Sequence, residues 1–155
     1  MPYAEPSYMQ GFSSPYYKQS HHELRLAVRQ FMVDHVIEEG MACEQNDKPA
    51  SKELFLKFGE AGLLAMRMGP GAHLPVKMIG GVDRGSFDYF HEMILHEEFC
   101  RLGLPGFQDS LATGMVIGLP PVMKFASKSV RDFVVPLVLS GAERICLAIS
   151  GIAFE

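Results

Sequence analysis

The sequence predicts a mainly α protein, an orthogonal-type bundle of five to six helices followed by one terminal β-strand. Along most of the chain apolar residues recur three and four positions apart, which is the period of a helix with one buried face. Capping residues and glycines flank these segments where helices would start and stop. Residues 145–150 alternate instead with the two-residue period of a strand. At 155 residues, one ordinary domain is expected.

The N-terminal residues 1–19 carry prolines among tyrosines and serines without any period, so they are expected to form a flexible or loosely docked arm. Ser20 and Glu23 stand in the order of a capping box, in which both side chains accept hydrogen bonds from backbone N–H groups at a helix start. A helix is therefore predicted from Ser20 to about Ala42. Its apolar stripe is Leu24, Val28, Phe31, Met32 and His35. The helical domain as a whole is placed at residues 20–143.

The next helix is predicted to begin after Ser51, whose hydroxyl suits an N-cap, and to end at Gly62, because glycine takes the left-handed conformation of a helix stop. Its apolar residues are Leu54, Phe55 and Phe58. Glycines and prolines then punctuate residues 68–85, which excludes a long regular element and predicts an extended loop.

Two more helices are expected in the following part of the chain. Asp88 is a cap for a helix that ends at Gly103. The next helix begins at Asp109 or Ser110, and the prolines at 120–121 are expected to break it, because proline lacks the N–H donor and clashes with the preceding turn.

Ser127 caps the last predicted helix, which Pro136 bends and Gly141 ends. Its apolar stripe is Val130, Phe133, Val134, Leu137 and Val138. Residues 144–155 are assigned to the first strand of a middle β-domain. Because a lone strand leaves its backbone donors and acceptors unpaired, the rest of that β-domain is expected to be missing from this chain.

The composition argues against several classes of function. The 14 lysines and arginines face 18 aspartates and glutamates without a run of either sign, so no nucleic-acid partner is expected. No apolar run is long enough to span a membrane. The cysteines Cys43, Cys100 and Cys146 form no close pair and are interpreted as reduced thiols. An intracellular protein is expected, cytoplasmic by default, with mitochondrial and peroxisomal locations left open.

Neither a metal site nor a catalytic residue is predicted. His91 and His96 are five positions apart, which turns the second ring about 140° away on a helix, so both cannot bind one ion. Glu92, Glu97 and Glu98 are interpreted as the polar face of the same helix, which supports solubility and no catalysis.

Four short motifs follow one another along the chain. They are FGEAGLL at 58–64, EEFCRLG at 97–103, VVPLVLSG at 134–141 and ICLAIS at 145–150. In this order they resemble the N-terminal part of the acyl-CoA dehydrogenases, over about residues 20–150. The resemblance implies a three-domain flavoenzyme that uses FAD for the α,β-dehydrogenation of acyl-CoA thioesters.

The resemblance also implies two sets of site residues. Those expected to lie against the flavin ring of FAD are Leu147, Ala148, Ile149 and Ser150. Of these, the Ser150 hydroxyl is the best single candidate for a contact to the edge of the isoalloxazine. Those expected to line the acyl tail of the substrate are Ser110, Thr113, Gly114 and Ile117. Ordinary helix packing is the alternative interpretation of the second set.

The chain departs from the family pattern after Ser150. It reads Gly-Ile-Ala-Phe-Glu where the family has an acidic residue and a turn ending in Gly-Ser-Asp. The family's glutamate base belongs to a C-terminal helical domain that has no counterpart here. This chain alone is therefore expected to be inactive and not to retain FAD. The rival hypothesis is a non-catalytic helical module that forms a homo-oligomer, or pairs with or regulates full-length relatives.

Overall fold

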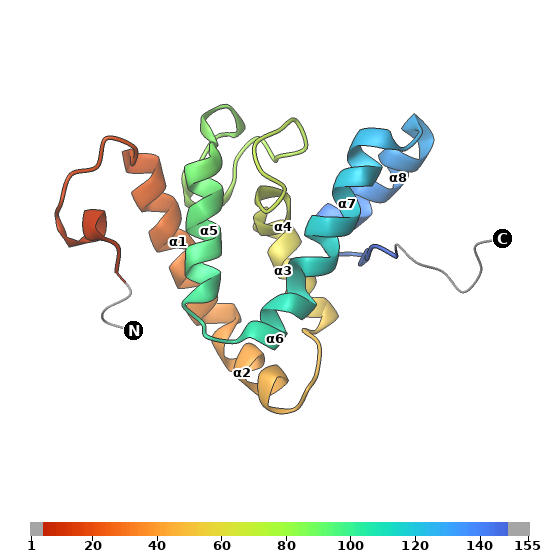
Figure 1. The fold of residues 1–155 in the computed structure, drawn as a ribbon, viewed down its shortest axis with the longest axis horizontal. Coiled ribbons are helices and arrows are strands. Elements are labelled where there is room, and N and C mark those ends of the chain that lie inside the picture. The colour runs from red at the N-terminus through yellow and green to blue at the C-terminus, as the bar shows by residue number, and fades with distance from the viewer. Residues whose placement is uncertain (1–4, 149–155) are drawn as a thin grey trace.

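A computed structural model describes residues 5–148, and these residues form helices joined by short loops and by one long connection between Met66 and Tyr89 (Figure 1). The predicted mainly α fold is confirmed. The helices are α1 (Gln19–His35), α2 (Ile37–Gln45), α3 (Lys52–Glu60), α4 (Leu63–Met66), α5 (Tyr89–Cys100), α6 (Pro105–Gln108), α7 (Gly114–Phe125) and α8 (Lys128–Leu139). A π-helical turn, Asp109–Thr113, joins α6 to α7. Three 3₁₀ turns are Ser7–Gln10, Ile79–Gly81 and Arg84–Ser86.

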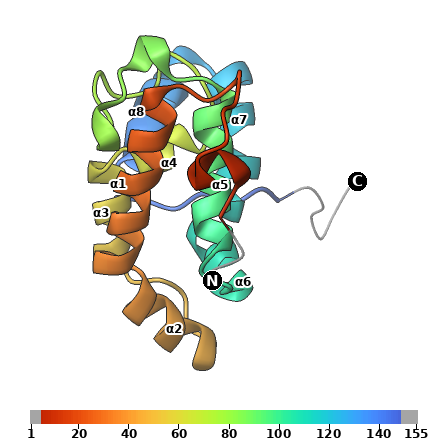
Figure 2. The same cartoon turned by 90° about the vertical axis from the view of Figure 1, so that its left-hand side faces the viewer.

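The helices form two groups that meet at the core. In Figures 1 and 2, α1 and α5 run side by side, whereas α7 and α8 form a second pair at the other end of the molecule. Between them, Phe58 of α3 is fully buried, and its ring lies 5.1 Å from that of Phe31 and 5.5 Å from that of Phe99. Each buried apolar side chain of this kind contributes about 1.5–3 kcal/mol to folding.

The first helix differs from its prediction at both ends. The proposed box of Ser20 and Glu23 is wrong, because α1 begins one residue earlier, and the N–H of its cap Lys18 donates to His21 Nδ1 at 2.8 Å. The helix also ends at His35 instead of continuing to Ala42. The chain bends at the fully buried Val36, and α2 then packs on α6.

The second predicted helix is confirmed. The Ser51 hydroxyl accepts a hydrogen bond from the N–H of Leu54 at 3.1 Å, and Gly62 has a φ of 74° at the helix stop. The three predicted apolar residues are buried. The α3 helix also lies directly on the end of α8, since a Cβ at Gly59 would overlap the carbonyl of Ser140.

The predicted loop at 68–85 is irregular as expected, yet it is packed. Its buried residues are Leu74, Met78 and Val82, and a single bridge pairs Lys77 with Asp83. Gly80 lies so close to α1 that a Cβ there would approach the Cα of Leu24 to 2.8 Å. The loop therefore covers one side of α1.

Two predictions for the fourth predicted helix are wrong. Helical structure begins at Pro105, before the predicted start at Asp109 or Ser110, because proline fits the first turn, where its missing N–H costs nothing. The prolines at 120–121 do not break α7. Both are exposed, so water can bind the carbonyl groups one turn earlier that lose their helical donors.

The last helix is capped as predicted, with the Ser127 hydroxyl accepting from the N–H of Val130 at 3.4 Å. Its apolar stripe is only partly buried. Val138 is in the core, but Val130 is 46% exposed and Phe133 is 70% exposed. The α8 helix thus keeps an apolar face that the described residues do not cover.

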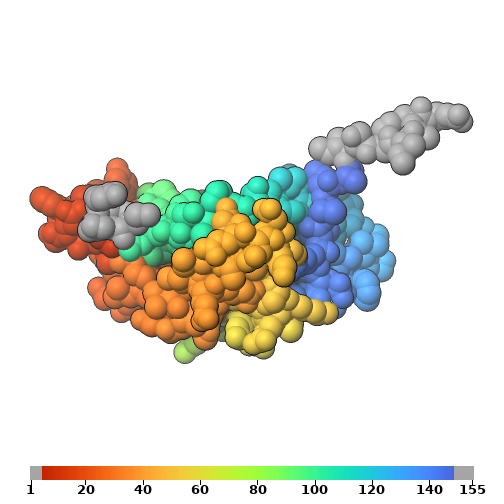
Figure 3. Space-filling model, turned by 90° about the horizontal axis from the view of Figure 1, so that it is seen from below, coloured from red at the N-terminus to blue at the C-terminus, as the bar shows by residue number. Residues whose placement is uncertain are grey.

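The predicted terminal strand does not form within the described residues. Residues 144–148 have no regular structure and pair with no other segment of residues 5–148. The physical reason is that a strand exists only as part of a ladder, and no neighbouring strand is present in this part of the chain. Figure 3 shows the segment on the surface at the opposite end from the N-terminal residues.

Candidate functional site

A cavity of about 300 Å³ lies between α3, the π-helical turn, α7, α8 and the segment after α8. Its lining consists of Phe55, Asp109, Ser110, Leu111, Ala112, Gly114, Met115, Val138, Glu143, Arg144, Ile145 and Cys146. The deeper wall is apolar, whereas Glu143, Arg144 and Asp109 are exposed. Two of the four residues predicted to line the acyl tail, Ser110 and Gly114, are among the residues that line this cavity.

The other two predicted acyl-tail residues do not line this cavity. The Thr113 hydroxyl donates to Asp109 Oδ1 at 2.8 Å, within the π-helical turn. Ile117 lies on the outer side of α7 and is 50% exposed. Ser110 is held in the wall because its hydroxyl donates to the carbonyl of Phe107 at 2.8 Å. The structure therefore divides the predicted set into two pairs.

The residues that lead into the predicted flavin segment, Ile145 and Cys146, cross the backbone of α7 at two glycines. A Cβ at Gly114 would lie 2.6 Å from the carbonyl oxygen of Ile145, and a Cβ at Gly118 would lie 3.1 Å from the carbonyl carbon of Cys146. Leu147 and Ala148 follow directly and are exposed. Ile149 and Ser150 lie outside the described residues.

The start of this segment is fixed by its arginine. The Arg144 guanidinium lies 4.0 Å from the centre of the Phe55 ring and donates to the carbonyl of Ala50. Among the described residues, no backbone hydrogen bond involves positions 145–148. Their N–H and C=O groups therefore have no hydrogen-bond partner within residues 5–148.

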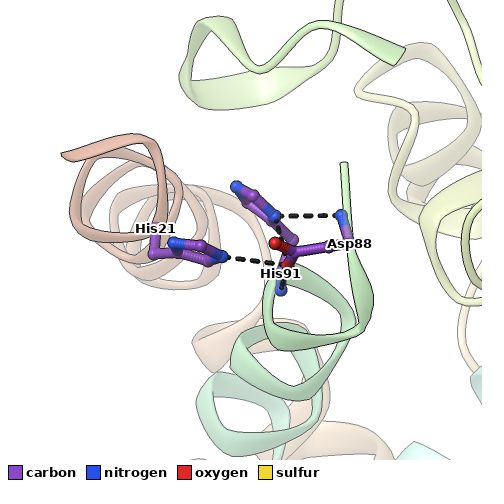
Figure 4. Close-up of side chains that lie close together, drawn as sticks. All are labelled: His21, Asp88 and His91. Atoms are coloured by element: carbon purple, nitrogen blue, oxygen red, sulfur yellow. Dashed lines mark hydrogen bonds and ion pairs between the residues drawn. The ribbon is translucent and has the colours of Figure 1, made fainter. Parts of the chain in front are cut away.

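A second cluster of polar groups lies where α1 and α5 begin (Figure 4). His21 Nε2 and His91 Nδ1 lie 2.9 Å and 2.8 Å from the same oxygen, Oδ1 of Asp88, and His91 Nε2 lies 3.1 Å from the hydroxyl of Ser20. Asp88 caps α5 as predicted, since its Oδ1 also accepts from the N–H groups of Phe90 and His91.

The arrangement of protons in this cluster disfavours a metal ion. His21 Nδ1 accepts from the N–H of Lys18, so its proton is on Nε2, where it donates to Asp88. A metal ligand needs a lone pair at that nitrogen. The His21 and His91 rings are also stacked, with centroids 3.8 Å apart, so one ion cannot lie in both ring planes. The arrangement fits a hydrogen-bonded helix cap.

The cluster shifts two pKa values. Burial alone would raise the pKa of Asp88, but the hydrogen bonds from His21 and His91 outweigh burial and lower that pKa to about 2. Burial, together with the neighbouring His21, lowers the pKa of His91. The folded state thus favours an ionised carboxylate beside a neutral imidazole.

The interpretation of Glu98 as part of a solvated helix face is wrong. Glu98 is 2% exposed, and it accepts hydrogen bonds from the fully buried Arg25 at 2.6 Å and from Arg29 at 2.8 and 2.9 Å. Glu5 joins this network through Arg29 and Arg101. Arginines placed among the apolar stripe positions of α1 were the available sequence signal.

The network also docks the N-terminal residues. Tyr8 is buried, its hydroxyl accepts from Arg25 Nε at 2.6 Å, and its ring stacks on that of Tyr17 with centroids 3.9 Å apart. In Figure 2 this part of the chain crosses α5. No helix within residues 5–148 combines the length and apolar character needed to cross a membrane.

Comparison with known proteins gives a consistent result. The family model described as "Acyl-CoA dehydrogenase, N-terminal domain" matches residues 18–142. Acyl-CoA dehydrogenase apdG of Emericella nidulans is 34% identical, and acyl-CoA dehydrogenase AFT10-1 of Alternaria alternata is 27% identical, each over 97% of this chain. The chain spans 35% of the length of either relative. No solved structure gives a significant match.

Proposed function

This chain belongs to the acyl-CoA dehydrogenase family, and we propose that it forms the N-terminal part of a flavin-dependent enzyme that oxidises acyl-CoA thioesters between Cα and Cβ. The observation that carries the proposal is the contact between α7 and the segment after α8. Gly114 is assigned to the acyl tail and Leu147 to the flavin. The two segments that carry these residues touch at Gly114 and Gly118.

The cavity supports a role in holding the apolar end of an acyl chain. Its deep wall consists of Leu111, Met115 and Val138 and would exclude water from a bound hydrocarbon tail. The removal of apolar surface from water is the main source of binding affinity for an acyl chain. Ser110 is tied to the backbone and so adds no free donor inside the wall.

The segment after α8 supports a role at the edge of the flavin. When bound, FAD supplies the acceptor for the hydride that leaves the substrate. Residues 146–148 are exposed, and the backbone of residues 145–148 has no hydrogen-bond partner among the described residues, so its N–H and C=O groups can orient the ring by hydrogen bonds. Ile149 and the Ser150 hydroxyl would continue that contact.

We assign the base that removes the α-proton, and the rest of the flavin site, to regions equivalent to the part of the relatives that this chain does not match. Residues 1–155 alone are therefore expected neither to retain FAD nor to oxidise an acyl-CoA. The second candidate, a helical module that pairs with another protein, is favoured by the exposed Phe125 and Phe133 on α7 and α8.

A chimera tests the proposal directly. Residues 1–150 of this chain would replace the matching N-terminal third of apdG, and FAD content and substrate-dependent bleaching of the flavin would be measured with a series of acyl-CoA thioesters. Retained flavin that bleaches supports the proposal. A folded chimera that lacks both, beside an active parent, overturns it. A chimera that does not fold also counts against it, because residues 1–150 would then not be equivalent to the segment that they replace.

Ser150→Ala in the same chimera tests the assignment at the flavin edge. Loss of one hydrogen bond should cost about 0.5–1.5 kcal/mol, or roughly two- to twelvefold in FAD affinity or turnover. Ser129→Ala, on the first turn of α8, is the matched control and should leave both unchanged. Unchanged affinity, spectrum and turnover in Ser150→Ala would remove that residue from the site and leave the family assignment intact.

A further inference from the structure

We propose that Gly114 and Gly118 are positioning residues, which let the segment after α8 lie on the backbone of α7 and so fix both the floor of the cavity and the course of the chain toward the flavin. The role of the segment rests on the proposed function. The contact itself does not, and it can be tested on this chain without any cofactor.

Conformational freedom does not explain these two glycines. Gly114 has a helical φ of −57°, and neither glycine is among the positions with positive φ. Glycine is a poor helix former, so two of them four residues apart weaken α7. Because residues four apart share a helix face, Gly114 and Gly118 together form a flat strip on one side of α7.

The segment after α8 occupies that strip. The Ile145 carbonyl oxygen would lie 2.6 Å from a Cβ at Gly114, a distance that real Cβ atoms do not reach. At Gly118 the nearest atoms, in Cys146 and Leu147, would lie 3.1–3.3 Å from a Cβ. All of these are backbone atoms, so no side-chain rotation can relieve the overlap. Any side chain at Gly114 must displace the segment itself.

The segment is anchored at its start. The Glu143 N–H donates to the Leu137 carbonyl at 3.1 Å, and Arg144 is stacked on Phe55. A methyl group at Gly114 therefore has to lift residues 145–148 away from α7. This movement opens the cavity at Ile145 and shifts the backbone groups that the proposed function aims at the flavin.

The test compares Gly114→Ala and Gly118→Ala with Gly85→Ala, which is the control because a Cβ there meets no atom within 4 Å and its φ is not positive. Two rates report on the segment: amide hydrogen exchange at Glu143, whose N–H is bonded to the Leu137 carbonyl at the start of the segment, and tryptic cleavage after Arg144. We expect Gly114→Ala to raise both roughly tenfold and Gly118→Ala about two- to threefold. The melting temperature should not fall, because alanine favours the α7 helix.

The outcomes separate the two proposals. Rates in both α7 variants equal to those of Gly85→Ala would overturn the positioning role and leave the chimera to decide the function. If Gly114→Ala does not fold, Gly118→Ala decides alone, since its neighbours need to move by only a few tenths of an ångström. Conversely, the α7 variants could show faster exchange and cleavage while the chimera holds no flavin. That result would support the contact between α7 and the segment after α8, and it would overturn the proposed role of this segment at the flavin.

Discussion

The two ends of this domain are held together by different interactions. Between α1 and α5, buried Arg25 and Glu98 pair side chain to side chain across the seam. Between α3 and α8, and between α7 and the segment that follows α8, backbone meets backbone at glycines such as Gly59 and Gly114. The first end depends on charge, and the second depends on the absence of a side chain.

The difference has a consequence for function. A buried ion pair fixes the α1–α5 seam in one arrangement, because separating its partners would leave an uncompensated charge. The other end carries the cavity, the exposed α8 face and a segment that the described residues do not pair. The rigid end thus supports the end at which ligands are proposed to bind.

The largest effect is expected from Glu98→Gln, which removes the buried carboxylate that Arg25 and Arg29 share and leaves Arg25 with only the partly exposed Glu97 as a counter-charge. We expect the free energy of unfolding to fall by about 3–5 kcal/mol, as measured by urea denaturation. Glu53→Gln is the matched control, because its pair with Lys57 is largely exposed and is worth at most about 0.5 kcal/mol. Equal losses in the two variants would show that the buried network does not hold the seam.

Gly59→Ala tests the other end of the comparison. The added Cβ would overlap the Ser140 carbonyl and force α3 and α8 apart, at a cost of about 1–3 kcal/mol. The loss of unfolding free energy in Gly59→Ala should not depend on salt or pH, whereas the loss in Glu98→Gln should. Gly103→Ala is not a suitable control, because its φ is positive, whereas Gly85→Ala is open and unstrained. A stabilised Gly59→Ala would contradict the close helix contact.

Acid should weaken the α1–α5 end in two steps. The pKa of His91 is lowered by folding, so its contribution is present above the ordinary value of 6.5 and is lost as the pH falls below it. The lowered pKa of Asp88, about 2 instead of 3.8, adds stability above pH 3.8 that is lost toward pH 2. After discounting for its partial exposure, Asp88 contributes about 1 kcal/mol.

Unfolding free energies measured from pH 7 to pH 2 check this order of events. Asp88→Asn should remove the lower step, because an amide does not titrate. Persistence of that step in Asp88→Asn would assign it to another carboxylate, and a profile without a decline between pH 6.5 and 5 would contradict the role of His91.

The smallest effect is expected from the helix caps. Ser51→Ala removes the 3.1 Å bond from the N–H of Leu54 and the bond that the hydroxyl donates to Glu39, and should cost about 1 kcal/mol. Ser127→Ala removes a longer bond of 3.4 Å at the exposed start of α8, and should cost about 0.5 kcal/mol. Thermal melting of both variants checks the order, and a larger loss for Ser127→Ala would reverse the proposed ranking of the two ends.

Local signals predicted most helix starts and stops correctly. Ser51, Asp88 and Ser127 cap the helices that follow them, and Gly62 and Gly141 adopt the positive φ of a stop. These features succeed because a cap satisfies backbone groups within a few residues of itself. The ordered motifs likewise indicated the family, since several short motifs in one order are far more specific than any single one.

Long-range contacts could not be predicted in the same way. The helix break at Val36, the burial of Glu98 and the intact α7 at residues 120–121 all depend on what the rest of the molecule places beside them. For the candidate site, the sequence grouped four residues that the structure separates, since Ser110 and Gly114 line one cavity and Thr113 and Ile117 do not.

The sequence by itself therefore determined the fold class, the family, and the caps and stops of α3, α5 and α8, because period, caps and motifs each depend on only a few neighbouring residues. The tertiary structure alone decided which charges are buried and which glycines carry a close backbone contact. The physical reason is that the energy of a buried ion pair or of a steric overlap belongs to two segments at once. Arg25 and Glu98 lie 73 residues apart, and neither reveals its burial until both helices are in place.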